Sequence, residues 1–331
     1  MGKNKEDLPI LFRTFLSIKT AEGKAKSTLR QYKDNYAYFE RFLELRRIPK
    51  DFSELNRALF RDYITYMREE IIAFDGHRYK SDKQRKRGLA SGTINTRLKT
   101  LRVMFRCLYE EEITPSNPID GVKNIPDPVD NIEVLTIDEL RRLLQAPDKT
   151  SYAGMRDVSL LYLSIDSMAR IGELTQLKSS DFDFDHNTVT IRAGVAKNRK
   201  PRTLPLRPAT TKLIKRLVLA NEEFNTDYVF LTNYGEPIDR DLFRKRLYEY
   251  GEKAKIKKKI HPHLLRHSAA TSFLEDGGSI RHLQMLLGHS DLRMVLRYTH
   301  LSNKAVEGQH TLHSPINKIA DKRNRPRKTK L

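Results

Sequence analysis

The sequence has a single cysteine, Cys107, and no tryptophan. One thiol excludes an intramolecular disulfide and any zinc site built from several cysteines. No apolar run approaches the length of a membrane-spanning helix, and the polar residues 1–9 lack the apolar stretch of a secretory signal. These absences favour a cytoplasmic globular protein that does not enter a membrane.

Acidic residues are few relative to basic ones. The 42 Asp and Glu stand against 62 Lys and Arg, which gives a formal net charge of +20 at pH 7. A field of that size favours a polyanionic partner, and nucleic acid is the commonest polyanion. The alternative is a basic surface that only aids solubility. At 331 residues the chain exceeds what one hydrophobic core usually serves, so we expect two domains.

Apolar residues recur at helical spacing through the first part of the chain. The pattern predicts helices over 27–47, 55–69 and 93–112, with a short helix before them around Phe12 and Phe15. A basic segment, residues 77–87, separates the second and third of these helices. It contains Arg78, Lys80, Lys83, Arg85, Lys86 and Arg87 against one acidic residue. This composition fits a flexible arm that follows DNA phosphates. It fits a solvated loop without a function equally well.

Prolines mark the boundary between the predicted domains. Pro115, Pro118, Pro126 and Pro128 fall close together, and proline cannot continue a helix. A capping box from Thr136 to Glu139 then opens a new helix. We therefore expect an all-helical domain over 1–118, a linker over 119–135, a second domain over 136–310 and a basic tail over 311–331.

The second domain mixes helices with a few strands. Helical spacing covers 158–165, 173–177, 213–219 and most of 240–298. Residues 188–191 alternate as a strand does, and 203–206 would pair with them through a basic turn. The fold class expected is α+β, mainly α, with a small antiparallel sheet.

Four spaced elements in this domain carry residue types suited to chemistry. They are Arg170-Ile-Gly-Glu173, the basic turn around Lys197, the run His261-Pro-His263-Leu-Leu-Arg266-His267, and Leu-Gly288-His289 followed by Tyr298. Each alone has an ordinary explanation, such as a surface ion pair, an exposed lysine or a core histidine. The histidines could also bind zinc. However, no glutamate follows His263 as in metalloprotease helices, and no acidic or cysteine ligand completes a set.

Together and in this order, these elements resemble the tyrosine recombinase (phage integrase) family. The family carries an arginine helix, a hairpin lysine, a His-x-x-Arg box, a Leu-Gly-His box and a tyrosine about nine residues later. The resemblance covers the chain from about Leu8 to Tyr298, including an N-terminal SAM-like, core-binding domain that clamps DNA. It departs from the family at Ser167-Met168-Ala169, where Thr-Gly-Leu is usual. The hairpin base is assigned to Lys197 by its distance from Leu204, and Lys200 and Arg202 are near it.

The resemblance implies the following roles. Tyr298 is the nucleophile, and Arg170 and Arg266 hold the non-bridging phosphate oxygens, because guanidinium groups stay charged and donate in a fixed fork. Lys197 protonates the departing deoxyribose oxygen, His263 assists proton transfer at Tyr298, and His289 donates to a phosphate oxygen. Glu173 supports this group, whereas His267 and His300 are interpreted as structural. No metal ion or cofactor is implied.

The leading hypothesis is a site-specific recombinase that acts on double-stranded DNA with inverted half-sites. It would work as a homotetramer on DNA or with a paired recombinase, for a mobile element or, alternatively, for chromosome-dimer resolution as in Xer-type recombinases. A type IB topoisomerase has a similar active site but acts as a monomer. A catalytically inert DNA-binding protein is the third hypothesis, and the filled catalytic positions argue against it.

Overall fold

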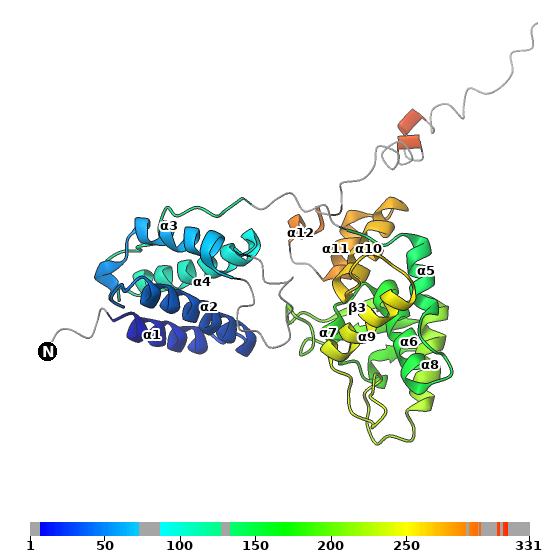
Figure 1. The fold of residues 1–331 in the computed structure, drawn as a ribbon. Helices are drawn as coiled ribbons and strands as arrows, with labels where there is room; N and C mark the ends of the chain where they lie inside the picture. The colour runs from blue at the N-terminus through cyan, green and yellow to red at the C-terminus, as the bar shows by residue number, and fades with distance from the viewer. Residues whose placement is uncertain are drawn as a thin grey trace, which may run out of the picture. The chain divides into compact units, whose positions relative to one another are not determined.

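The computed structural model describes residues 7–72, 87–126, 133–288, 291–296, 298, 310–311 and 314–316. Of the residues singled out above, His289, His300, Pro128, Arg78, Lys80, Lys83, Arg85 and Lys86 lie outside these ranges. The chain divides into two compact units, Met1–Asp130 and Asn131–Leu331 (Figure 1). Each unit has a hydrophobic core of its own.

Helices build the first unit. They are α1 (Leu8–Ala21), α2 (Lys26–Leu45), α3 (Arg57–Thr65) and α4 (Ser91–Glu110), with a 3-10 turn over Phe52–Glu54 and a π turn over Tyr66–Glu70 (Figure 1). Helices α1, α2 and α4 pack against one another. The apolar faces predicted from helical spacing lie inside this unit: Phe39 and Leu43 of α2 and Leu98, Leu101 and Phe105 of α4 are 0% exposed.

Residues 119–126, at the start of the predicted linker, pack on the first unit. Ile119 is buried in its core, and the Asn95 side chain exchanges two hydrogen bonds with the backbone of Ile125, at 2.8 and 3.0 Å. Leu135, at the other end of the linker, is buried in the core of the second unit, and its N–H donates to Ser268 Oγ at 2.8 Å. Both ends of this stretch are therefore held by the unit next to them.

The second unit combines helices with one sheet. The helices are α5 (Ile137–Gln145), α6 (Tyr152–Ser167), α7 (Ile171–Leu174), α8 (Pro208–Ala220), α9 (Arg240–Lys253), α10 (Pro262–Glu275), α11 (Ile280–Leu287) and α12 (Arg293–Leu296). Strands β1 (Phe182–Asp183), β2 (Thr188–Ile191) and β3 (Arg202–Pro205) form an antiparallel sheet in the order β1-β2-β3. Val189 pairs with Leu204 and both are buried, which confirms the pairing predicted across the basic turn. Strand β1 was not predicted, because two residues are too short to show a period.

Helix α6 lies at the centre of the second unit and packs against α5, α8 and α10. Ser151 caps its start by accepting the Gly154 N–H at 3.1 Å, and the predicted capping box of Thr136 and Glu139 opens α5. Leu160, Leu161 and Leu163 of α6 are 0% exposed. A helix that is apolar around most of its circumference in this way is a core helix.

A buried ion cluster links α6 to α9. Asp157 is 0% exposed, and its carboxylate accepts hydrogen bonds from Arg156 at 2.8 Å, from Tyr250 Oη at 2.6 Å and from Arg246. Arg156, which is 2% exposed, also donates to the Leu231 carbonyl at 2.7 Å. The single carboxylate therefore pairs with two guanidinium groups, and that of Arg156 is buried away from water.

Replacing Asp157→Asn should destabilise the protein by about 3–5 kcal/mol, because removal of one partner leaves a buried charge uncompensated. Urea unfolding of the full-length chain measures the change. Asp138→Asn is the matched control, since Asp138 pairs with Arg141 on an exposed surface. Unfolding midpoints that shift equally in both variants would contradict the central role of Asp157.

Candidate active site

The short helix α7 places Arg170 and Glu173 together. Arg170 precedes the helix, and its backbone N–H donates to Glu173 Oε2 at 3.1 Å. This bond closes the first turn, since a side chain at the third helical position satisfies an amide that has no partner within the helix. Glu173 is 2% exposed, whereas the Arg170 side chain is 22% exposed and remains accessible to a ligand.

The Glu173 carboxylate joins α7 to the β2–β3 hairpin. Arg202 Nη2 donates to it at 2.6 Å, and the backbone N–H of Lys197 donates at 3.3 Å. Burial by itself would raise the pKa of Glu173, but the hydrogen bond and the charge of Arg202, with the backbone N–H groups, lower it below its usual value. Glu173 is therefore an anion that holds the turn carrying Lys197.

The same contacts distinguish the candidate hairpin bases. Arg202 is engaged with Glu173, whereas the side chains of Lys197 and Lys200 are exposed. Asn198 Nδ2 donates to the Gly288 carbonyl at 3.2 Å, so the turn also contacts the end of α11. Gly288 has φ +61°, and a Cβ there would lie 3.0 Å from the Arg202 guanidinium carbon. Glycine in the Leu-Gly-His box thus permits both the helix end and the close approach of Arg202.

Helix α10 begins at the His-Pro-His run. Its N-cap, His261, accepts the Leu264 N–H on Nδ1 at 3.1 Å, and Pro262 occupies the first helical position. His263, Arg266 and His267 follow at helical spacing, so they lie on one side of the helix. The sequence therefore places three polar side chains of this box toward one region of the unit.

Arg266 of α10 is 5% exposed and ties two helix ends together, those of α6 and α11. Its Nη1 donates to the Met168 carbonyl at 2.7 Å, and its Nη2 donates to the Leu287 carbonyl at 2.8 Å. Burial, with a smaller effect from the charge of Arg170, lowers the pKa of Arg266 to about 10. The guanidinium is therefore still charged at neutral pH, and the charges of Arg170 and Tyr298 both act on it.

Met168, where the family usually has glycine, adopts a left-handed conformation with φ +52°. It ends α6, and its carbonyl oxygen accepts a hydrogen bond from Arg266. Its side chain is 7% exposed and packs in a cluster with Ala270, Leu287 and Tyr298. The backbone thus takes a conformation that glycine favours, while the side chain fills a place beside the candidate nucleophile.

Tyr298 is 4% exposed and its hydroxyl contacts His267. His267 Nδ1 lies 2.7 Å from Tyr298 Oη, and the two ring centroids are 5.4 Å apart. The Tyr298 N–H donates to the Val295 carbonyl at 3.0 Å, which continues the turn of α12. The interpretation of His267 as structural did not anticipate its contact with the hydroxyl of Tyr298, the candidate nucleophile. The His-x-x-Arg-His run is the only signal for it, because spacing alone cannot pair a side chain with a residue 31 positions away.

His263 lies among cationic groups. Partial burial lowers its pKa most, and the charges of His261, Arg266, Arg170 and Lys197 lower it further. A neutral imidazole is therefore present at pH 7. The described members of the predicted site, namely Arg170, Glu173, Lys197, His263, Arg266 and Tyr298, are linked by direct contacts or by these charge effects.

The basic segment of the first unit is described only at its end. Arg87 is exposed, and its Nε donates to the Glu69 carbonyl at 2.6 Å. Within the described ranges, no three histidine, cysteine or acidic side chains are grouped as a metal site, and no helix is long and apolar enough to cross a membrane.

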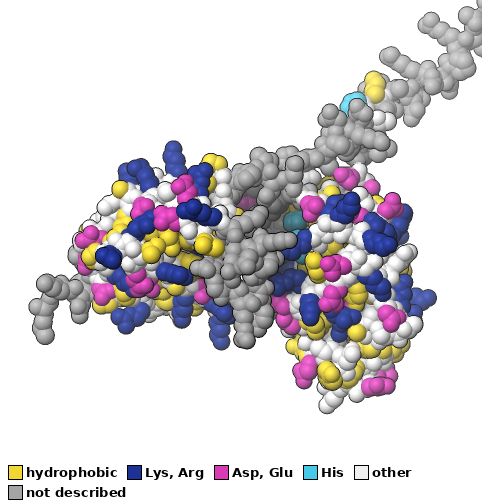
Figure 2. Space-filling view, in the orientation of Figure 1, with side chains coloured by type: hydrophobic (Ala, Val, Ile, Leu, Met, Phe, Trp, Pro, Cys, Tyr) yellow, Lys and Arg dark blue, Asp and Glu magenta, His cyan; other side chains and the backbone are white. Residues whose placement is uncertain are grey.

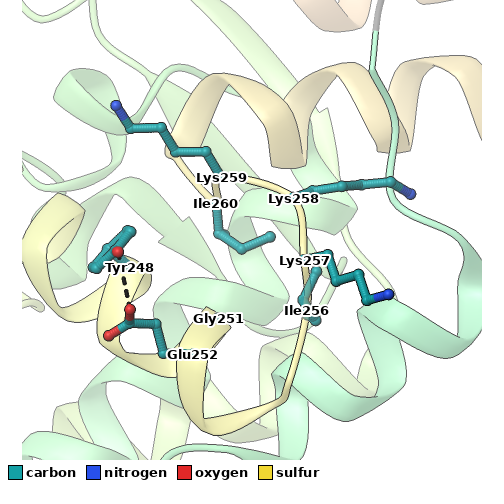
Figure 3. Close-up of a pocket in the computed structure, with 8 residues that line it drawn as sticks. All are labelled: Tyr248, Gly251, Glu252, Ile256, Lys257, Lys258, Lys259 and Ile260. Carbon is teal, nitrogen blue, oxygen red and sulfur yellow. Dashed lines mark hydrogen bonds between the residues drawn. The ribbon is translucent and has the colours of Figure 1, made fainter. Parts of the chain in front are cut away.

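A surface hollow of about 380 Å³ lies apart from the catalytic candidates. It is lined by α9 residues Tyr248, Gly251 and Glu252 and by the loop 256–260 (Figure 3). Lys259 extends to the opposite side of this loop from Lys257 and Lys258. Lys258 donates to Glu139 at 2.6 Å and to the Val134 carbonyl at 2.8 Å. The loop therefore attaches α5 to the start of α10, and so it supports the segment that carries His261 to His267.

Comparison with known proteins identifies the family. The phage integrase family matches residues 133–305, and the phage integrase SAM-like domain matches residues 11–125. The chain belongs to the phage integrase family. It is a tyrosine recombinase, an enzyme that transfers DNA strands. The expected fold, a helical SAM-like domain followed by a mainly helical catalytic domain with a small antiparallel sheet, is confirmed.

Relatives within the family match nearly the whole chain. Tyrosine recombinase XerC of Bacillus pumilus is 30% identical, with 94% of this chain and 97% of the relative covered. Tyrosine recombinase XerD of Listeria innocua is 27% identical, with 88% and 93% covered. A solved structure of the Tn1549 transposon integrase in complex with a circular intermediate DNA has the same fold, with a TM-score of 0.71 at 18% identity. It covers 93% of this chain and 99% of its own.

Glu173→Gln should lower the stability of the recombinase at pH 7 by about 3 kcal/mol, because it leaves the Arg202 charge without its buried partner. The pKa of Glu173 is lowered by folding, so its contribution is present above the usual pKa of glutamate and is lost as the pH falls through the folded value. The difference in free energy of unfolding between the variant and the wild type should therefore become smaller at acid pH.

Urea unfolding at a series of pH values measures this difference. Asp183→Asn is the control, because Asp183 also has a lowered pKa but is exposed and pairs with the exposed His186. A difference that is constant from neutral to acid pH would contradict an ionic role for Glu173.

Proposed function

We propose that this protein is a site-specific recombinase that cleaves DNA with Tyr298 and rejoins it through a 3′-phosphotyrosyl intermediate. The observation that carries the proposal is the convergence of separate segments on one site. Arg170, the Lys197 turn, the α10 box and Tyr298 meet at the ends of α6 and α11. This gathers two guanidinium groups, a lysine, histidines and a phenol, as metal-free cleavage of a phosphodiester requires.

Arg170 and Arg266 are assigned to the non-bridging oxygens of the scissile phosphate, where charge accumulates in the transition state. Lys197 is assigned as the donor of a proton to the departing 5′-oxygen. His263, neutral and close to the cations, is assigned to assist proton transfer at Tyr298, and His289 to donate to a phosphate oxygen. Since the phosphotyrosyl bond keeps the energy of the broken bond, rejoining needs no nucleotide.

Double-stranded DNA with inverted half-sites is the proposed substrate, bound by a homotetramer or with a paired recombinase. Lys and Arg side chains are spread over the visible face of both units (Figure 2), in keeping with the net charge of +20. Related recombinases have been seen on DNA: a lambda integrase dimer bound to a core site shares the fold, with a TM-score of 0.65. We also propose that the basic segment of the first unit contacts DNA phosphates. Its residues are Arg78, Lys80, Lys83, Arg85, Lys86 and Arg87.

The biological role proposed from the sequence is the integration, excision or resolution of a mobile element. The names of the relatives favour the second candidate, a Xer-type recombinase, since XerC and XerD proteins match nearly the whole chain at 27–30% identity. Purified protein can distinguish them: a Xer-type enzyme recombines a site in the host chromosome, whereas an element enzyme recombines the ends of the element. A type IB topoisomerase would instead relax supercoiled plasmids that contain no such site.

Tyr298→Phe should abolish the covalent protein–DNA adduct while DNA binding is kept, because only the attacking oxygen is removed. The substrate is a duplex selected by binding from a random pool and nicked beside the cleavage position, so that cleavage is trapped. Denaturing gels measure the adduct, and Tyr248→Phe is the control, since the Tyr248 hydroxyl donates to Glu252 on the surface of α9. An adduct that persists in Tyr298→Phe would refute the assignment of the nucleophile.

Arg170→Ala should slow cleavage by at least ~10²-fold, as the loss of one preorganised charge contact does in other active sites. The fold should survive, because Glu173 keeps its shorter bond with Arg202. Single-turnover cleavage in EDTA measures the rate, with the exposed Arg141→Ala as the matched control. Cleavage near the wild-type rate would mean that another group holds the phosphate.

A further inference from the structure

We propose that His267 accepts the proton of the Tyr298 hydroxyl when Tyr298 attacks the scissile phosphate, and returns it when the strand is rejoined. This inference rests on the proposed function and adds a catalytic residue to it. The contact is direct, at 2.7 Å between His267 Nδ1 and Tyr298 Oη. That distance is within the reach at which a general base takes a proton without an intervening water.

The surroundings of Tyr298 favour a side-chain acceptor. Tyr298 is 4% exposed and packs in an apolar cluster with Met168, Ala270, Leu283 and Leu287. Bulk water is therefore held back from most of the ring. A phenol of usual pKa near 10 is also almost wholly protonated at neutral pH, so attack requires removal of the proton as the new bond forms.

The two histidines of α10 have different surroundings. The charges of Arg266, Arg170 and Lys197, the cations proposed to meet the phosphate, act on His263. His267 is one turn further along the helix and contacts the phenol itself. Arg266, next to His267 in sequence, lies within range of the Tyr298 charge and would stabilise negative charge that grows on Oη.

The step balances without any added reagent. Tyr298 Oη bonds to phosphorus, the bond from phosphorus to the 5′-oxygen breaks, and its electron pair stays on that oxygen. The phenol proton moves to His267 Nδ1, and Lys197 supplies a proton to the 5′-oxygen. In rejoining, the 5′-hydroxyl attacks and gives its proton to Lys197, while the departing Tyr298 oxygen recovers a proton from His267.

The test separates proton acceptance from positioning. His267→Asn keeps a hydrogen-bonding group near the place of Nδ1 but cannot take up a proton at neutral pH. The substrate is the nicked selected duplex with a 5′-bridging phosphorothiolate, whose thiolate departs without a proton donor, so that the pH profile no longer depends on Lys197. His186→Asn, on the exposed β1–β2 turn, is the matched control.

His267→Asn should slow single-turnover cleavage by about 10²-fold or more, as the loss of a general base does, and the rise in rate with pH on the acid side should disappear. Wild type and His186→Asn should keep that rise. A His267→Asn variant with near wild-type rate and an unchanged pH profile would overturn the proposal, since a hydrogen bond alone would then suffice.

Chemical rescue covers the case in which His267→Asn fails to fold. His267→Ala opens space beside Tyr298 Oη, and added imidazole should restore cleavage in proportion to its unprotonated fraction. A folded, DNA-binding His267→Ala without rescue would overturn the proposal. Tyr298→Phe separates the two hypotheses: adduct formation in that variant refutes the proposed function, whereas its absence together with active His267→Asn refutes only the role of His267.

Discussion

The catalytic unit depends on one buried guanidinium. Arg266 is 5% exposed and donates to two backbone carbonyls, those of Met168 and Leu287, which end α6 and α11. Orphan carbonyls at helix ends need donors, and a charged donor makes the stronger hydrogen bond. The residue proposed to bind phosphate is thus held by the scaffold in a fixed orientation, and the same bonds fix the helix ends that carry the rest of the site.

The position of the proposed nucleophile, Tyr298, depends on this arrangement. Met168 and Leu287, whose carbonyls accept hydrogen bonds from Arg266, also pack their side chains in the cluster that contains Tyr298. His267, the next residue on α10, contacts the Tyr298 hydroxyl. A second anchor, the Glu173 carboxylate, attaches Arg170, Arg202 and the Lys197 turn to each other. Rigid support of this kind is what places charged groups where a transition state develops charge.

Local patterns in the sequence were sufficient for most elements of the fold. The capping box at Thr136, the apolar faces of α2 and α4 and the pairing of β2 with β3 all depend on residues close in sequence, and all are present. The contacts of Arg202 with Glu173 and of His267 with Tyr298 are different, because they join residues 29 and 31 positions apart. Such pairs depend on how separate elements pack together. The periodic patterns of a single sequence do not reveal that packing. The motif therefore grouped candidate residues, but it did not indicate which of their side chains contact each other.

Met168 shows how a departure from the family motif can be accommodated. A left-handed backbone costs a residue other than glycine roughly 1–2 kcal/mol. Burial of a methionine side chain contributes about 1.5–3 kcal/mol relative to leaving it exposed, and Met168 is 7% exposed. The two effects are of similar size, so the packed side chain offsets the backbone strain. Because that side chain belongs to the same buried cluster as Tyr298, the methionine adds apolar packing around the proposed nucleophile that a glycine could not supply.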